Sequence, residues 1–166
     1  MNRYALLTVA VAAVAFAQAP AVEKAPAIRA DHKLACPAGT KQVGGLKSNM
    51  QLFACMKLGA EGMRVFHGPM ISLYASGKVE AVGQAEDGFR TGKWTFFNEQ
   101  GVKTGETEFL KGDFNGRRAF FNADGSLKAE ENWVKGMRQG PQTTFVNGVA
   151  TVTEYKDDRP VAAPAK

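Results

Sequence analysis

From residue 68 onward, short stretches rich in aromatic and β-branched residues alternate with glycine-containing turn signals. The clearest apolar stretches cover residues 94–97, 118–121 and 143–146, and turn sequences such as NADG and LKG separate them. Nothing beyond residue 60 has the length or the 3.6-residue periodicity of a convincing helix. With about 12 residues for each strand and its turn, the pattern predicts an all-β fold, an antiparallel β-meander.

The turn signals recur every 24 residues. Three glycine series keep this step: Gly68, Gly92, Gly116 and Gly140; Gly77, Gly101 and Gly125; Gly88, Gly112 and Gly136. We interpret these as turn glycines, which tolerate positive φ. A fixed period in this range indicates a repeat architecture. We therefore expect about four 24-residue hairpin repeats over residues 67–159, forming a single twisted or curled sheet of about eight strands.

Two details follow from this alignment. The last unit fits only after two residues are deleted, and it carries Asp158 where a glycine is expected, as is usual for the end unit of an array. Gly112 is predicted in a turn with positive φ, whereas Gly83 falls inside a strand. A valine should therefore destabilise the protein more at Gly112 than at Gly83.

Side chains alternate between the two faces of a strand. Trp94 and Phe96 should share one face, with Phe97 on the other unless a bulge intervenes. A predicted aromatic stripe runs along the sheet through Phe109, Trp133 and Tyr155, and a row of carboxylates occupies the opposite face at Glu106, Glu130 and Glu154. Such a stripe is normally core. Aromatics that the curl of the sheet leaves uncovered would instead form a possible binding surface, made of Trp94, Phe97, Phe121 and Trp133.

The units resemble the MORN-like repeats of bacteria over residues 67–159. Three units carry the match. The residues are His67 and Gly68 in the first; Gly92, Lys93, Trp94, Phe96, Phe97, Gly101, Phe109 and Gly112 in the second; and Gly116, Phe120, Phe121, Gly125, Trp133 and Gly136 in the third. Met70, Arg118 and Gln142 depart from the pattern by replacing its tryptophan, and Ala85 replaces its second-strand aromatic. The resemblance implies hairpin arrays that bind proteins or lipids, and some bacterial members are described as antitoxins. Fold-level similarity alone transfers no partner.

Residues 1–17 have the features of a secretory signal peptide: Arg3 in the n-region, a short apolar segment, and an A-x-A cleavage site ending at Ala17. The chain is therefore expected to be exported, to the periplasm or the medium. Residues 18–34 are rich in alanine and proline and are predicted to form a flexible linker, as is the tail from residue 160 to 166. The mature chain contains no apolar stretch long enough for a transmembrane helix.

Cys36 and Cys55 are the two cysteines of the chain. In an exported protein an even pair favours a disulfide, which would add about 3 kcal/mol by closing a loop of roughly 20 residues. Two cysteines without a nearby histidine pair fall short of a zinc site, and C-x-x-C is absent. Residues 35–66 should thus form a disulfide-stapled N-terminal cap, with a strand near residues 50–58 on the edge of the first unit.

The formal net charge of +5 does not come from the repeats. Residues 68–159 hold 12 Lys or Arg and 13 Asp or Glu, a net of −1, whereas residues 18–67 hold 7 against 3, a net of +4. This distribution does not match the basic stripe of a nucleic-acid-binding protein. A basic arm could favour an anionic envelope surface, lipid or cell wall, through Lys33, Lys41, Lys47 and Lys57.

No motif for catalysis, for a cofactor or for a metal is present. His67 occupies a slot filled by Thr, Asn and Gln in later units, which indicates a polar turn position. Glu130 and Glu131 should point to opposite faces and cannot share a proton. We therefore expect a non-enzymatic module for protein–protein interaction or scaffolding. An antitoxin- or immunity-like inhibitor and a binder of anionic envelope surface are the alternatives.

Overall fold

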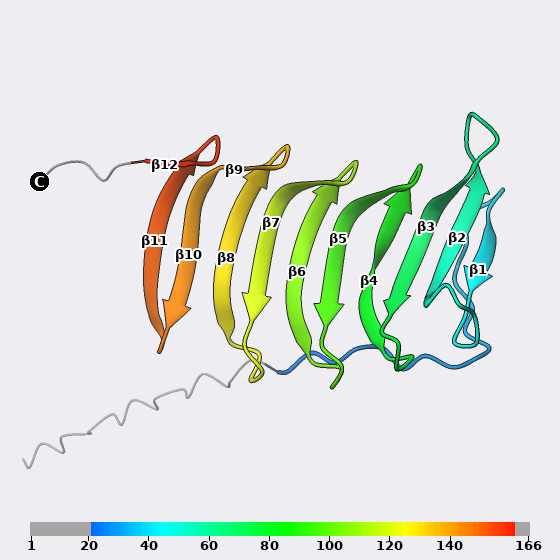
Figure 1. Ribbon diagram of the computed structural model, residues 1–166. Helices are drawn as coiled ribbons and strands as arrows, with labels where there is room; N and C mark the ends of the chain where they lie inside the picture. Colours follow the sequence, from blue (N-terminus) through cyan, green and yellow to red (C-terminus); the bar gives the residue numbers. More distant parts are fainter. Residues whose placement is uncertain (1–20, 162–166) are drawn as a thin grey trace, which may run out of the picture.

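The computed structural model describes residues 21–161, which form one open antiparallel sheet of 12 strands (Figure 1). The predicted signal peptide, linker residues 18–20 and the tail from residue 162 lie outside the described residues. Neighbouring strands in the sheet follow one another along the chain, except that the short β9 pairs with β8 beside β10. The predicted β-meander is therefore confirmed.

The strands are β1 (Lys41–Gly44), β2 (Leu52–Leu58), β3 (Arg64–Leu73), β4 (Val79–Glu86), β5 (Phe89–Phe97), β6 (Lys103–Leu110), β7 (Asp113–Phe121), β8 (Leu127–Val134), β9 (Met137–Arg138), β10 (Gly140–Val146), β11 (Val149–Lys156) and β12 (Arg159–Pro160). The sheet is longer than the eight strands expected, because β1 and β2 extend it at one end and the short β9 and β12 count separately. The predicted strand near residues 50–58 corresponds to β2, but β1 lies outside it at the edge.

Two kinds of turn alternate along the sheet, one at each end of the strands. Pairs of residues with positive φ connect the strands at one end, beginning with Asp87 (φ 50°) and Gly88 (φ 91°). Positive φ at both central residues is the type I′ geometry, whose twist suits a hairpin. Longer loops stand at the other end, where the Gly101 N–H donates to the Asn98 carbonyl at 2.8 Å. In the last unit the two-residue deletion replaces this longer loop by Asn147 and Gly148.

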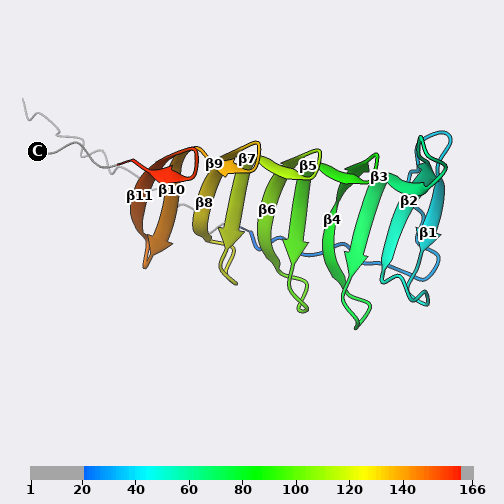
Figure 2. The ribbon, with the colours of Figure 1, turned by 45° about the horizontal axis from the view of Figure 1, so that its top comes forward.

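All ten glycines of the three series have positive φ, but those of the first series are not in turns. Gly68, Gly92 and Gly116 lie within β3, β5 and β7, at register shifts against the preceding strand. Each shift leaves two extra residues on the glycine-bearing strand, and such bulges bend a strand. Figure 2 brings the bent ends of successive hairpins forward. The assignment of this series as turn glycines is therefore corrected.

Gly83 is needed for a reason that the sequence pattern does not reveal. Its φ is not positive, yet a Cβ built there would lie 2.3 Å from Cδ2 of Trp94. The Trp94 indole lies flat on the glycine and is fully buried, and its Nε1 donates to the Gln84 carbonyl at 2.9 Å. Glycine is required here by close packing rather than by backbone conformation, so we now expect a valine to destabilise the protein more at Gly83 than at Gly112.

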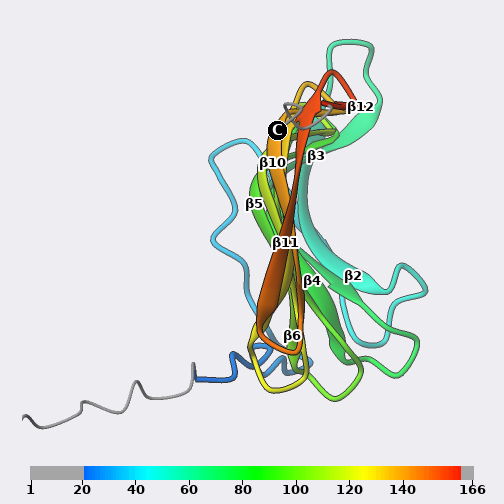
Figure 3. The same cartoon turned by 90° about the vertical axis from the view of Figure 1, so that its left-hand side faces the viewer.

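Residues 21–40 run beneath the lower strand ends in Figure 1, from β7 back to β1, and pack against one side of the sheet (Figure 3). The Ala25 N–H donates to the Gly101 carbonyl at 2.8 Å, and Lys24 forms a bridge with Val102. Ile28 and Leu34 pack against a buried cluster made of Phe53, Ile71, Leu73, Val79 and Phe97. In residues 21–34 the prediction of a flexible linker is wrong, because a few apolar side chains among the alanines and prolines suffice to dock it.

The predicted disulfide is present. Cys36 and Cys55 are bonded, with 5.5 Å between their Cα atoms, and Cys55 is buried in β2. The bond joins the end of the docked segment to the second strand of the sheet. It completes the disulfide-stapled N-terminal cap.

Candidate functional site

The two faces of the sheet have different environments. The covered face, which contacts residues 21–40, carries Phe53, Ile71, Val82, Thr95 and Glu106. The aromatic face, on the other side, carries Trp94, Phe96, Phe109, Phe114 and Trp133. No other segment of residues 21–161 packs over the aromatic face. The search for a binding site therefore concerns this face, the two sheet edges and their hollows.

The four aromatics proposed as a binding surface do not form one. Trp94 and Phe97 are 0% and 3% exposed and belong to two core clusters on opposite faces. Phe121 is half-buried on the covered face, where the Lys103 ammonium lies 4.4 Å from its ring. Only Trp133 is partly accessible on the aromatic face. Trp94 and Phe97 are therefore core residues, which corrects their assignment.

The predicted aromatic stripe exists with different members. Ring contacts run from Trp94 to Phe109 at 6.4 Å, from Phe109 to Phe114 at 5.3 Å, and from Phe114 to Trp133 at 5.1 Å. Tyr155 continues the register but contacts Arg138 instead, whose guanidinium lies 4.3 Å from its ring. Sequence reasoning missed Phe114, because equivalent positions 24 residues away hold arginine.

Arginines and aromatics exchange places between successive units on this face. In β5 the Arg90 guanidinium stacks on the Trp94 ring at 4.4 Å. In β7 the order is inverted, and Arg118 stacks on Phe114 at 4.6 Å. Both pairs are four residues apart, and the exchange keeps a cation–π pair within the strand in each of these two units. In the sequence, this exchange is visible because Arg118 stands where the repeat pattern has a tryptophan.

An ion-pair network lies on the covered face. Glu106 accepts from Lys93 at 2.8 Å and from Lys103 at 3.3 Å, and Lys103 also pairs with Glu23 of the docked segment at 2.6 Å. Burial alone would raise the pKa of Glu106, but hydrogen bonds and charges from the two lysines outweigh it and lower that pKa. Burial likewise opposes the charge of Lys103, yet its pKa is raised because Glu23 and Glu106 bond to it. The network fastens the N-terminal segment to the repeats.

The acidic pair Glu130 and Glu131 does point to opposite faces, as predicted. Glu130 accepts from Arg117 at 2.7 Å on the covered face, whereas Glu131 accepts from Trp133 Nε1 at 3.0 Å on the aromatic face. His67 lies 3.4 Å from Asp87, whose pKa is lowered mainly by its hydrogen bond with Lys57. Among residues 21–161, no three His, Cys, Asp or Glu side chains are placed to hold a metal ion.

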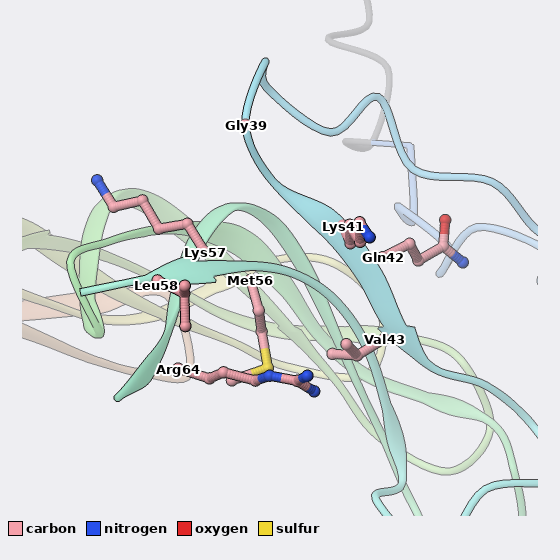
Figure 4. Close-up of a pocket in the computed structure, with 8 residues that line it drawn as sticks. All are labelled: Gly39, Lys41, Gln42, Val43, Met56, Lys57, Leu58 and Arg64. Atoms are coloured by element: carbon pink, nitrogen blue, oxygen red, sulfur yellow. The ribbon is translucent and has the colours of Figure 1, made fainter. Parts of the chain in front are cut away.

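At the N-terminal edge, a hollow of about 480 Å³ opens between β1 and β2 (Figure 4). Met56 and Val43 supply apolar walls, and Arg64 extends along them. Lys57 points away in this view and pairs with Asp87 at 2.7 Å. Within residues 21–161, Lys41 and Arg64 form no ion pair. Two of the basic residues of this region are therefore free to meet an anion.

Within residues 21–161, the C-terminal edge of the sheet is open. β11 pairs with β10 from Val149 to Tyr155, but with β12 only through Tyr155 and Lys156. Seven of its eight residues are exposed, and Val149 and Val152 are 68% and 59% exposed. The Glu154 carbonyl accepts from Val161 at 2.8 Å and therefore points outward. Alternation along a strand places the main-chain groups of residues 150 and 152 on this same outer side.

No helix in residues 21–161 is long and apolar enough to cross a membrane. No family model and no curated protein matches the chain. Among solved structures, the chain is similar to part of a GtfA/B complex bound to UDP and GlcNAc, with 17% identity and a TM-score of 0.41. That alignment covers 74% of this chain and 25% of the other. A likeness at this level carries no functional argument.

Proposed function

We propose that this protein is an exported, non-catalytic module for protein–protein interaction or scaffolding, and that it binds an extended segment of a partner along β11. The observation that carries the proposal is that, among residues 21–161, β11 is paired on one side only from Val149 to Thr153. Unpaired N–H and C=O groups along an edge are a template for an added strand. The resemblance of residues 67–159 to MORN-like repeats supports the same class of function.

The composition of β11 favours strand addition. Folded proteins commonly blunt an edge strand with lysine, proline or a bulge, and residues 149–153 contain none of these. The side chains alternate, with Val149, Thr151 and Thr153 on one face and Ala150 and Val152 on the other. A partner strand with β-branched residues on both faces would extend this small apolar surface. At the opposite end, β1 has only four residues and is held by the disulfide nearby.

The test is capture of partners from an envelope and secretome extract by mature protein, residues 18–166, compared with a Val152→Pro variant. Proline removes the outward N–H of residue 152, and the fold tolerates proline on an edge strand whose N–H faces solvent. Val152→Ala is the matched control, because it shortens the side chain but keeps the donor. We expect one stoichiometric partner with wild type and with Val152→Ala, and its loss with Val152→Pro at an unchanged melting temperature.

Retention of the partner by Val152→Pro would refute the β11 site. If the partner is a toxin that harms cells lacking this protein, the module is an inhibitor of the antitoxin or immunity kind.

Binding of anionic envelope material is the second candidate, and the free Lys41 and Arg64 at the N-terminal hollow favour it. Each such residue contributes only about 1 kcal/mol at an anionic surface. Binding to anionic vesicles should therefore weaken steeply between low and physiological salt. A Lys41→Gln, Arg64→Gln variant with undiminished vesicle binding would contradict this candidate.

A further inference from the structure

A groove on the aromatic face follows the middle strand of the sheet, β6, between β5 and β7. Its hollow measures about 320 Å³, and we call it the β6 groove, lined by Arg90, Phe96, Gly105, Phe114, Arg118 and Phe120. The volume is at the lower end of the roughly 300–1,000 Å³ found for ligand sites. It is far from the β11 edge in strand order, so its role is independent of the proposed function.

The floor of the groove is low because of a glycine. Gly105 is paired with Phe96 on one side and with Phe120 on the other, so two rings stand beside a residue without a side chain. Positive φ does not explain this glycine, since Gly105 is not among the positive-φ residues. A Cβ there would meet the Ala119 carbonyl at 3.2 Å and Phe96 at 4.0 Å. Any larger side chain would rise into the space between the rings.

In the preceding unit a large side chain lies across the aromatic face of β4. There the floor is Gly83, and the indole of Trp94 lies on it, fully buried. Twenty-four residues later, Thr107 replaces the glycine and Arg118 replaces the tryptophan. Arg118 does not lean across the floor, because its guanidinium stacks on Phe114 at 4.6 Å and Phe120 at 4.7 Å within its own strand. The side chain at the tryptophan position therefore does not cover β6 as Trp94 covers β4.

Two guanidinium groups border this open space. Arg90, from β5, lies 5.7 Å from the Phe109 ring and has no side-chain hydrogen bond or ion pair within residues 21–161. Arg118, from β7, reaches one carboxylate, Glu131, at 3.5 Å, and Trp133 also bonds to that oxygen. The Nε of Arg118 is buried and has no partner in the described residues. A buried N–H of this kind costs free energy unless an acceptor reaches it.

We infer that the β6 groove binds a small amphiphile: a flat or aliphatic apolar group that carries one anionic group, such as a carboxylate, sulfonate or phosphate. The apolar part lies over Gly105, between Phe96 and Phe120. The anion faces the guanidinium groups of Arg118 and Arg90, both of which line the groove. Stacking on the rings holds both guanidinium groups before the ligand arrives, which lowers the entropy cost of binding.

The experiment uses two matched fluorescent probes, anionic 1-anilinonaphthalene-8-sulfonate and its uncharged analogue N-phenyl-1-naphthylamine, titrated into folded mature protein. We expect saturable binding of the sulfonate at one site. Arg118→Gln should weaken sulfonate binding about tenfold, as for loss of a charged hydrogen bond, and leave the uncharged probe nearly unaffected. Gly105→Val should abolish binding of both probes. Arg64→Gln, which removes a positive charge at the distant N-terminal hollow, should change neither.

A direct readout on wild type keeps the test independent of how the variants fold. In ¹⁵N-labelled protein, the sulfonate should shift the amide signals of Gly105 and Thr107 and the Nε–H signal of Arg118. Shifts centred on other strands would overturn the inference. Equal sulfonate binding by wild type and a folded Gly105→Val variant would overturn it as well.

Discussion

β2 and β11 are strands of similar length near opposite ends of one sheet, and they differ almost completely in burial. In β2, Phe53, Ala54 and Cys55 are at most 1% exposed, whereas seven of the eight residues of β11 are exposed. Both strands pair with a neighbour over nearly all of their residues. Main-chain pairing thus forms a strand at either end of the sheet. Burial at the β2 end comes from the docked N-terminal segment and the disulfide, and neither of these contacts β11.

The largest difference is expected from equivalent truncations at the two ends. Phe53→Ala should cost about 3–5 kcal/mol of unfolding free energy, as for a fully buried phenylalanine. Phe145→Ala in β10 should cost less than half as much, because Phe145 is only half-buried. Urea unfolding of the two variants measures both values. Equal costs would mean that the C-terminal units are covered in solution by something other than this chain.

A glycine pair refines the comparison between core and surface. Gly83→Val must displace the Trp94 indole, and we expect a loss of about 3 kcal/mol from overpacking. Gly112→Val strains a type I′ turn at φ 92° and meets only Phe89, at 3.1 Å, so we expect a loss of about 1–2 kcal/mol. Thermal unfolding of both variants gives the order, and a lower melting temperature for Gly112→Val would refute the role of Trp94.

Removing the disulfide should affect only one end. The double substitution Cys36→Ala, Cys55→Ala is expected to lower stability by about 3 kcal/mol. Amide hydrogen exchange should then accelerate in residues 21–58 and stay unchanged in β10 and β11, because units of a repeat sheet contact only their neighbours. Uniform acceleration over the whole sheet would show instead that the sheet unfolds as one cooperative unit.

A smaller effect concerns the ion pairs that attach the N-terminal segment. Glu106 has a lowered pKa when folded, so its contribution to stability is present above the unfolded value near 4.5 and is lost as pH falls through the folded pKa. Lys103 has a raised pKa, so its contribution is present below 10.5 and is lost as pH rises through the folded pKa. Glu106→Gln should therefore lower stability at pH 7 and flatten the acid side of the profile. A profile identical to wild type would contradict this.

The 24-residue period predicted the sheet well. The turns and bulges that require positive φ recur at this spacing, and glycine occupies them. All ten glycines have positive φ, although Gly68, Gly92 and Gly116 lie at bulges within strands and not in turns. What the sequence could not predict depends on packing between distant residues. The docking of Ile28 and Leu34 leaves no periodic pattern in the sequence. The burial of Trp94 depends on the absence of a side chain at Gly83. The β6 groove arises from residues on three strands, and only Arg118 in the tryptophan slot marks it.

The N-terminal segment has a consequence for the order of folding events. Its contacts join Glu23 to Lys103, 80 residues later in the chain, whereas each hairpin joins residues close in sequence. Contacts between distant residues form late because a long loop must close first. Residues 21–34 must therefore wait until β6 exists before they can bind to it. The N-terminal segment therefore docks only onto a sheet that has already formed.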